Sequence, residues 1–481
     1  MLEDLIKERR KKLEKLRERG FDAYPASVKR TFAIGEAGGK FDPLRKSKKK
    51  VFLAGRILGS RDQGNIIFLD VADESGRIQF VIRKDVLKDF DFWKSVLDIG
   101  DFAGSSGILF KTKKGEKSLE CDSFGIITKS LRPLPAGWYG LEETETRLRK
   151  RYLDILANPE AREIFRKKDI FWSSFREYLK KEGFLEVEAP VFETVPGGAE
   201  TEPFVTHHNA LDVDFYLRIS LELPLKKLLV GGFEKVFEIG RIFRNEGIDK
   251  EHLQDYTQLE FYWAYRDYGD LMEFLEKLYK HVIKKTCGTL TTTHGDRKIN
   301  WGRKWSKLDY VSEFKKAAGI DPTSASRDEL SKKALSLGLD PEKNYGKGRL
   351  IDLIFKKTVR PNLIQPCFLV DPPVEIEPLA KRRLGNPRVV ERVQIMACGT
   401  ELGKGFSELN DPIDQRARFE EQMKLREAGD KEAQRLDEDF IEALEYGMPP
   451  AAGFGTSERL FAILMDKPVR ETVIFPLMRP K

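Results

Sequence analysis

Cysteine, histidine and long apolar runs are all scarce in this chain of 481 residues. The four cysteines, Cys121, Cys287, Cys367 and Cys398, stand far apart without a CxxC pair, so they indicate neither a zinc framework nor a disulfide scaffold. The five histidines form no metal-ligand pattern. No apolar stretch approaches the roughly 18 residues of a membrane span, and the charged N-terminus argues against a signal peptide. We therefore expect a cytoplasmic protein from a reducing compartment.

Neither sign of charge dominates the composition. Charged residues make up 34% of the chain, yet the net charge is only +7. The basic residues gather in two stretches, 7–19 and 45–50. Such runs are usually solvated faces, although they are also compatible with a polyanionic partner. At roughly 100–200 residues per domain, the length indicates two to four domains.

The N-terminal part of the chain predicts a basic helix followed by a small β-barrel. Residues 1–20 have helical spacing of apolar side chains, with Gly20 as the C-cap. Residues 51–130 hold five short strands separated by turn signals, a pattern typical of a barrel. One such barrel, the OB-fold, binds single-stranded nucleic acid on one strand face. The predicted strands are Val51–Leu58, Ile66–Val71, Ile78–Ile82, Phe102–Phe110 and Ser118–Ile127.

A linker and a larger domain follow the predicted barrel. Two prolines in residues 131–135 break regular structure, and we place the linker at 131–145. Residues 146–481 alternate helical and strand patterns, which predicts an α+β domain. Within it, 158–182 reads as one long helix, and 267–345 is richer in helical patterns and is predicted to be an insertion.

The strongest local signal lies in residues 236–265. Two strand patterns, Val236–Phe243 and Tyr256–Tyr265, flank a polar loop. Alternation in the second strand directs Gln258, Glu260 and Tyr262 to one face, opposite an apolar face. The guanidinium of Arg244 stands at the mouth of the loop, where its planar fork can pair two phosphate oxygens. An ordinary hairpin with a surface Arg–Glu pair is the alternative interpretation.

A second signal is a glycine-rich stretch near the C-terminus. Gly453 and Gly455 precede a helical pattern that Thr456 or Ser457 can cap, and Arg459 falls in its first turn. The start of a helix offers free N–H groups and the positive end of a dipole, so the stretch predicts a phosphate site. Plain turn chemistry is the alternative.

A third signal pairs two carboxylates with two glycines. Glu401 and Glu408 bracket Gly403 and Gly405. Carboxylates in such a strand can bind Mg²⁺ or a cationic substrate. Two exposed acids beside a turn are the alternative.

Taken in order, these stretches resemble the three signature motifs of class II aminoacyl-tRNA synthetases. Residues 183–190 resemble motif 1, which forms the dimer interface in that family; 244–265 resemble motif 2; and 453–459 resemble motif 3. The resemblance is to bacterial-type lysyl-tRNA synthetases and covers nearly the whole chain, including VPGGAETEPFVTHHNALD, LRISLELPLKKLLVGGFEKVFEIGRIFRNEGI and GFSELNDP. It implies an OB-fold anticodon-binding domain at 51–130, a catalytic domain on an antiparallel sheet with flanking helices, and a homodimer.

The resemblance also implies an activity and its residues. ATP would activate L-lysine to lysyl-adenylate, and the lysyl group would pass to tRNA(Lys). Fixed cations and positioning, with Mg²⁺ offsetting triphosphate charge, would supply most of the catalysis. Arg244 and Arg459 would be the catalytic residues. The resemblance assigns ATP to Arg244, Glu246, His252, Tyr256, Glu401 and Arg459; lysine to Gly198, Glu222, Glu260, Tyr262 and Glu408; Mg²⁺ to Glu401 and Glu408; and the anticodon to Arg61, Phe68 and Gln79.

Four features depart from the family pattern. Motif 3 is one residue shorter than usual. Gln394 stands where the family has a second acidic magnesium ligand, and Lys404 replaces an asparagine beside the substrate. Ser123 replaces a glutamate used in anticodon reading.

Two other functions stay open at this point. A synthetase of the same subclass for aspartate or asparagine would share the barrel and the motifs, but it needs a cationic or amide-reading pocket. A catalytically inactive RNA-binding or regulatory paralogue is suggested by Gln394 and Lys404. The residues that oppose it are all present: Arg244, Glu401, Glu408 and Arg459.

Overall fold

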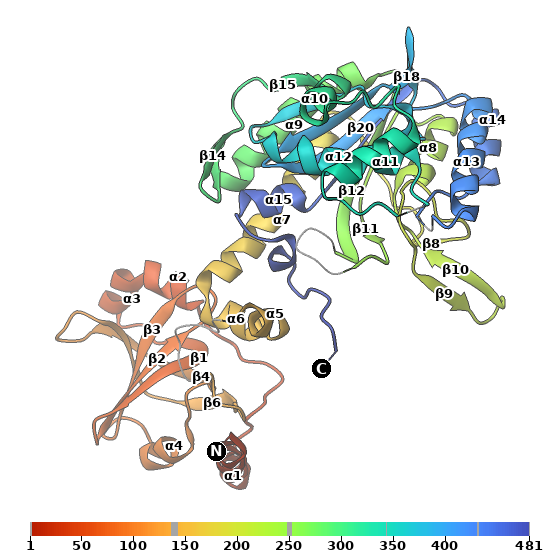
Figure 1. Cartoon of the computed structure of the whole chain (residues 1–481). Coiled ribbons are helices and arrows are strands. Elements are labelled where there is room, and N and C mark those ends of the chain that lie inside the picture. Colours follow the sequence, from red (N-terminus) through yellow and green to blue (C-terminus); the bar gives the residue numbers. More distant parts are fainter. Residues whose placement is uncertain (1, 136–142, 248–252, 343, 431, 481) are drawn as a thin grey trace. The chain divides into compact units, whose positions relative to one another are not determined.

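The computed structural model describes residues 2–135, 143–247, 253–342, 344–430 and 432–480. The chain divides into two compact units, Met1–Gly140 and Leu141–Lys481 (Figure 1). Among the described residues, no helix is both long enough and apolar enough to cross a lipid bilayer.

The first unit is a closed β-barrel with short helices around it. Its strands follow the order β1-β2-β3-β5-β4-β6, and β1 also pairs with β4, which closes the barrel. Alternate residues such as Leu53, Leu69, Phe80 and Leu119 fill the interior, as period-2 alternation in a barrel requires. The predicted OB-fold is confirmed. The elements are α1 Leu2–Glu18, α2 Ile34–Gly39, α3 Phe41–Ser47, β1 Val51–Asp62, β2 Ile66–Ala72, β3 Arg77–Arg83, α4 Phe90–Val96, β4 Phe102–Lys111, β5 Lys117–Cys121 and β6 Gly125–Thr128.

Two details of the first unit refine the sequence prediction. Helix α1 ends before Gly20, whose φ of 76° is the left-handed conformation expected of a glycine C-cap. The strand predicted at 118–127 is instead two strands, β5 and β6, and each pairs with β4.

The second unit is built on an eight-stranded sheet in the order β15-β16-β19-β20-β21-β12-β11-β7. The pairs from β16 to β11 are antiparallel, and only the edge pairs β15–β16 and β11–β7 are parallel. The predicted α+β domain on an antiparallel sheet is therefore confirmed. Its strands are β7 Leu185–Glu186, β8 Phe192–Glu193, β9 Val205–His208, β10 Val213–Leu217, β11 Lys235–Phe243, β12 Asp255–Ala264, β13 Thr291–His294, β14 Arg297–Asn300, β15 Ser306–Asp309, β16 Cys367–Val370, β17 Arg382–Arg383, β18 Asn386–Val390, β19 Arg392–Ala397, β20 Thr400–Ser407 and β21 Ala451–Ser457.

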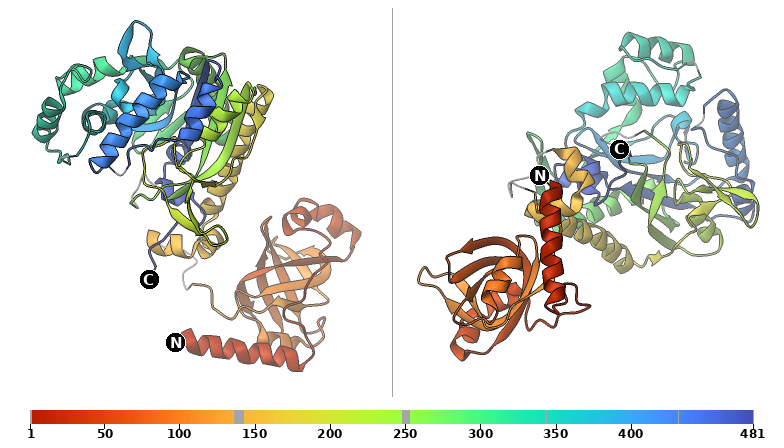
Figure 2. Two further views of the ribbon diagram at one scale, coloured as in Figure 1. Left: turned by 90° about the vertical axis from the view of Figure 1, so that its right-hand side faces the viewer. Right: turned by 90° about the horizontal axis from the view of Figure 1, so that it is seen from below.

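Helices cover both faces of this sheet (Figure 2). One face, with Phe237, Leu259 and Phe454, packs against α7, α9 and α15. The other, with Val236 and Phe406, packs against α8, α13 and α14. A third core joins α10, α11 and α12 to β16. The helices are α5 Thr144–Arg149, α6 Arg151–Ala157, α7 Pro159–Lys181, α8 Glu222–Val230, α9 Tyr268–Cys287, α10 Tyr310–Ala318, α11 Arg327–Ser336, α12 Lys347–Thr358, α13 Pro412–Glu427, α14 Glu438–Glu445 and α15 Arg459–Leu464.

The stretch predicted as a helical insertion, 267–345, is more mixed than its pattern indicated. It contains α9, α10 and α11 but also the strands β13, β14 and β15. Strand β15 joins the main sheet beside β16, so the stretch contributes to the central sheet as well as to its helical cover.

Candidate active site

A polar cavity of about 740 Å³ lies over the face of the sheet formed by β12, β21, β20 and β19. This volume is in the range of sites that enclose a small ligand. Residues of β12, β19, β20, β21 and α12 and of several loops line the cavity. The predicted polar face of β12 contributes Gln258, Glu260 and Tyr262 to it, whereas Leu259 and Phe261 are buried on the opposite face. The prediction from alternation is therefore confirmed.

Two glycines in β21 form the floor of the cavity. Gly453 pairs with Tyr262 on one side and Phe406 on the other, and Gly455 pairs with Glu260 and Lys404. On the cavity face, Gly453 and Gly455 of β21 therefore carry no side chain, whereas β12 and β20 on either side carry long ones. A Cβ at Gly453 would collide with Oε1 of Glu408 and the ring of Tyr262. Close approach of neighbouring side chains therefore requires glycine at position 453.

The glycine-rich stretch is thus not the loop before a helix that its sequence indicated. It is strand β21, and the helix that follows, α15, spans only six residues. Thr456 donates its hydroxyl to the carbonyl of Leu402 and does not cap the helix. Ser457, the other predicted cap, accepts from the backbone N–H of Arg459 at 3.5 Å. Ser457 and Arg459 both line the cavity, and the phosphate site at this helix start stays a prediction.

Three carboxylates and one ammonium form a buried acidic cluster beside one end of the cavity: Glu222 and Glu260 line the cavity, and Lys226 and Glu408 are buried behind its wall. Lys226 donates to Oε1 of Glu222 at 2.6 Å and lies 2.5 Å from Oε2 of Glu408. Glu260 accepts from the Ser220 hydroxyl at 2.8 Å, the Leu221 amide at 3.1 Å, the Tyr262 hydroxyl at 2.9 Å and Gln258. The cluster residues Glu222, Lys226, Glu260 and Glu408 are all less than 10% exposed.

The acidic cluster is short of positive charge. Burial raises the pKa of Glu222 to about 7 and the pKa of Glu408 well above its ordinary value, and Lys226 offsets this only in part. Burial lowers the pKa of Lys226, but Glu222 and Glu408 together outweigh it and raise that pKa. With every group ionised, the three carboxylates and one ammonium of the cluster leave an excess of two negative charges. A dicationic ligand group would neutralise that excess.

Two arginines and a tyrosine mark the other end of the cavity. Arg244 follows β11, donates from Nε to the carbonyl of Ile219 at 3.3 Å, and lies 5.7 Å from the centre of the Tyr256 ring. Arg244, Tyr256 and Arg459 also line a smaller pocket that shares these residues with the cavity. Glu246 accepts from the Thr201 hydroxyl at 2.7 Å. The structure therefore brings both predicted phosphate-binding arginines to one place.

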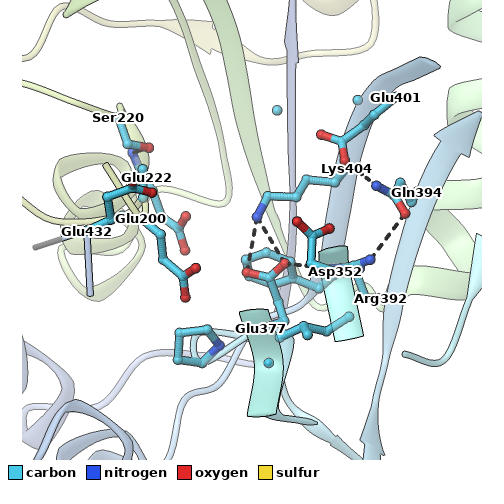
Figure 3. Close-up of a pocket in the computed structure, with 18 of the residues that line it drawn as sticks. Glu200, Ser220, Glu222, Asp352, Glu377, Arg392, Gln394, Glu401, Lys404 and Glu432 are labelled. Atoms are coloured by element: carbon cyan, nitrogen blue, oxygen red, sulfur yellow. Dashed lines mark hydrogen bonds and ion pairs between the residues drawn. The ribbon is translucent and has the colours of Figure 1, made fainter. Parts of the chain in front are cut away.

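A row of polar side chains on β19 and β20, with Glu377 beside it, lines another part of the cavity (Figure 3). Lys404 donates to both oxygens of Glu377 at 2.9 and 3.2 Å, and Arg392 donates to Glu377 at 3.2 Å and to Oε1 of Gln394 at 3.1 Å. The amide nitrogen of Gln394 donates to Glu401. Burial alone would raise the pKa of Glu401, yet Arg459, Lys404 and Arg392 hold it below its ordinary value.

A β-bulge in β20 sets the direction of Glu401. Gln394 pairs with Lys404 and Ile395 with Gly403, but Met396 pairs with Glu401, so Leu402 is an extra residue. Strict alternation would direct Glu401 and Lys404 to opposite faces. The bulge places both in the cavity and buries Leu402 in the core on the other face. The carbonyl of Leu402 accepts hydrogen bonds from the hydroxyls of Tyr279 and Thr456.

The structure does not bring the two predicted magnesium ligands together. Glu401 and Glu408 are seven residues apart along β20 and its continuation, which is roughly 23 Å at about 3.3 Å per residue. Glu408 is buried against Lys226. Of this pair, Glu401 remains the carboxylate suited to a divalent cation. In the part of the chain that the structure describes, no group of three or more acidic, histidine or cysteine side chains is arranged for a metal ion.

The remaining predicted residues lie as follows. Gly198 lines the cavity with a φ of 81°, and a Cβ there would crowd Ser220 and Glu222 at 2.9–3.0 Å. His252 lies outside the described residues.

The predicted anticodon residues lie on neighbouring strands of the barrel. Arg61 on β1 is the register partner of Phe68 on β2, and its guanidinium is 5.9 Å from the centre of that ring. Gln79 on β3 is paired with Asp70, which is 3.7 Å from Arg61. Oε1 of Gln79 accepts from the Ser118 hydroxyl at 3.0 Å, and its side chain is only 6% exposed.

Several polar residues in the cavity or behind its wall escaped the sequence analysis, and Lys226, Glu377 and Arg392 are among them. Lys226 lies four residues after Glu222 on α8, a spacing that places ion pairs on one helix face and could have indicated the contact. Glu377 and Arg392 meet across 15 residues of chain, and no local pattern predicts their meeting.

Comparison with known proteins agrees with this geometry. Residues 143–479 match the family described as tRNA synthetases class II (D, K and N), and residues 51–127 match the OB-fold nucleic acid binding domain. The chain is 45% identical to the lysine--tRNA ligase of Moorella thermoacetica, over 99% of this chain and 98% of that protein. The protein of the same name from Carboxydothermus hydrogenoformans is 45% identical over 100% and 99%, and that from Oceanobacillus iheyensis is 43% identical over 100% and 99%.

Proposed function

The chain belongs to the class II tRNA synthetases (D, K and N), and we propose on this basis how its cavity activates an amino acid and which residues do so. It is a lysine--tRNA ligase: its curated relatives along the whole chain carry that activity, and its OB-fold domain is of the nucleic-acid-binding kind. ATP is the co-substrate that this family implies.

The observation that carries the lysine assignment is the charge of the acidic cluster. Lysine brings two ammonium groups, and the cluster has two negative charges in excess when ionised. Aspartate or asparagine brings one ammonium group, and would leave a buried carboxylate unpaired at a cost of several kcal/mol. The cluster therefore favours lysine over the other two substrates of the family.

Strand β12 gives the proposed direction of the bound substrates. Tyr256, near Arg244, is followed along the same face by Gln258, Glu260 and Tyr262, so about 20 Å of strand separates the two ends. The adenine would stack on Tyr256 with its amino group near Glu246. The α-ammonium would lie near Glu222, Glu260 and Gly198, and the ε-ammonium would reach Glu408 and Tyr262.

The reaction then needs positioning and charge rather than a covalent enzyme intermediate. A carboxylate oxygen of lysine bonds to the α-phosphorus of ATP, the bond from that phosphorus to the bridging oxygen breaks, and pyrophosphate leaves. Arg244 would hold the α-phosphate and the lysine carboxylate, and Arg459 the terminal phosphates. A terminal ribose hydroxyl of tRNA then attacks the acyl carbon, and AMP leaves. Mg²⁺, typical of the family, would offset triphosphate charge beside Glu401.

The test is ATP–pyrophosphate exchange measured with each amino acid. We expect lysine to support exchange and aspartate and asparagine not to. Glu408→Gln should reduce lysine-dependent exchange at least a hundredfold while ATP binding persists, because a neutral amide cannot pair the ammonium. The exposed Glu420→Gln is the matched control and should behave as the parent protein. Equal loss of lysine and ATP binding in Glu408→Gln would contradict the assignment.

We further propose that the protein acts as a homodimer through the region that resembles motif 1. In and next to this region the apolar residues Leu185, Val191 and Phe192 are 46%, 38% and 59% exposed in the single chain, and apolar side chains gathered on a surface mark a candidate protein–protein contact. Sedimentation of the purified protein measures this directly, and a monomer at micromolar concentration would exclude it.

A further inference from the structure

Lys404 is a cation that the cavity keeps accessible. Its side chain retains 43% of its surface, whereas its partner Glu377 and the neighbouring Arg392 retain only 4% and 7%. Figure 3 shows Lys404 extending from β20 toward Glu377, with Glu200 and Glu222 on the other side of the cavity. An ammonium has three donors, and two of those of Lys404 meet the oxygens of Glu377. One donor remains for a ligand in the cavity.

The groups beside Lys404 are poorly suited to a second divalent cation. Mg²⁺ takes oxygen ligands in near-octahedral geometry. The amide oxygen of Gln394 accepts from Arg392, and its amide nitrogen faces Glu401. Glu377 is already paired with two cations, Lys404 and Arg392. Glu401 is thus the carboxylate of this row that is not paired with a lysine or arginine side chain by direct contact.

The positions of Gln394 and Lys404 are directly linked. They are register partners in the β19–β20 ladder, so both lie on the same patch of the cavity wall. An acid at position 394 and a neutral residue at position 404 would make this patch more negative by two charges. With Gln394 and Lys404, the charge of this patch is therefore higher by +2 than with that other pair of residues. This difference equals the charge of one divalent cation.

We propose that the ammonium of Lys404 binds the polyphosphate of ATP directly and takes the place of a divalent cation. This enzyme therefore binds fewer metal ions with ATP than the same pocket would with an acid at position 394 and a neutral amide at position 404. The proposal rests on the proposed function only for the identity of the nucleotide. Gln394 is the β19 register partner of Lys404, and as a neutral residue it offers no carboxylate there to bind a divalent cation. Glu377 holds the ammonium in the cavity before ATP arrives.

Counting bound manganese tests this without catalysis. The full-length protein is mixed with ATP and Mn²⁺ in the absence of lysine, and free Mn²⁺ is measured by its paramagnetic resonance signal. We expect the Q394E/K404N double variant to bind at least one more Mn²⁺ per active site than the parent protein. The exposed Lys332→Asn is the matched charge control and should bind the parent number. Equal numbers in parent and double variant would overturn the proposal.

The single variant K404N provides a second measurement, because Lys404 is accessible and its loss should leave the fold intact. The free Mg²⁺ that half-saturates pyrophosphate exchange should rise about tenfold, equivalent to about 1.4 kcal/mol, while the KM for lysine stays within twofold. A rise in the lysine KM alone would mean that Lys404 binds the amino acid, and would overturn the proposal. Absence of lysine-dependent exchange in the parent protein would instead refute the proposed function and leave the manganese count valid.

Discussion

At the scale of single residues, Lys226 changes how the lysine pocket is understood. The sequence analysis treated Glu408 as an acid waiting for a substrate cation, but the structure pairs it with an internal ammonium. Recognition then depends on a balance of charges within the acidic cluster and not on one ion pair. Individual acids could be predicted from motifs such as GFSELND, whereas their shared partner could not, because Lys226 and Glu408 lie 182 residues apart in the chain.

The raised pKa of Glu222 predicts that lysine binding depends on pH. Below about pH 7 this carboxyl is largely protonated and cannot pair with an ammonium. A bound cation favours the ionised form, so binding releases a proton at low pH. The KM for lysine in the exchange reaction should therefore fall as pH rises from 6 to 8, by up to about tenfold per pH unit for one proton. Glu222→Gln should flatten the profile; a flat profile in the parent protein would contradict the assignment.

Removing the internal ammonium should destabilise the fold. Lys226→Met would leave buried carboxylates without their cation, and we expect the free energy of unfolding in urea at pH 8 to fall by about 3–5 kcal/mol. Lys227→Met is the matched control, because its ion pair with Asp439 lies at the surface and should contribute less than about 1 kcal/mol. Similar losses in the two variants would show that Lys226 is not the counter-ion of the cluster.

At the scale of secondary-structure elements, alternation predicted the hairpin of β11 and β12 well, whereas the local pattern predicted neither strand β21 nor the bulge in β20. In β12, Gln258, Glu260 and Tyr262 line the cavity while Leu259 and Phe261 lie in the core on the opposite face, so period-2 spacing alone places Glu260 and Tyr262 in the cavity. Strand β21 has two glycines, which local preference assigns to a loop. Only the neighbouring strands, with Glu408 and Tyr262 against Gly453, explain why the strand needs a glycine at position 453. The bulge at Leu402 is likewise set by packing and not by local pattern.

The floor of the cavity should tolerate a methyl group at one glycine but not at the other. A Cβ at Gly453 would collide with Glu408 and Tyr262, whereas a Cβ at Gly455 would lie 3.4 Å from Cγ of Glu260, an ordinary contact. Gly453→Ala should weaken lysine binding, measured by calorimetry, at least a hundredfold, and Gly455→Ala at most tenfold. The reverse order would show that the floor is not where lysine lies.

At the scale of the whole molecule, the sequence predicted two kinds of unit and the structure confirms both. The barrel has its own apolar core, separate from the three cores of the second unit. Strand spacing was sufficient to predict the barrel, because short strand patterns such as the alternating Val51–Leu58 are separated by turn signals. The sheet order of the second unit was out of reach, because β21 is inserted between β12 and β20 although it is the last strand in the sequence.

This division predicts that anticodon reading and amino-acid activation can be separated. Phe68→Ala removes a base-stacking surface worth about 1–3 kcal/mol, so the KM for tRNA in aminoacylation should rise five- to a hundredfold. Lysine-dependent pyrophosphate exchange, which needs no tRNA, should be unchanged. Phe52→Ala, in the same barrel but on β1 beside Gly104, is a control for general damage. A loss of exchange in Phe68→Ala would show that the substitution disturbs more than tRNA binding.

Because of the bulge in β20, the geometry of the catalytic cavity also depends on Tyr279, a residue that cannot touch a substrate. The hydroxyl of Tyr279, fully buried on α9 behind the sheet, is one of two that hold the displaced carbonyl of Leu402. We therefore expect Tyr279→Phe to lower turnover, so that a screen of growth or turnover alone would mistake it for an active-site substitution. Its true effect would be mechanical: without that anchor, the strand is freer to slide into regular register and turn Glu401 away from the nucleotide.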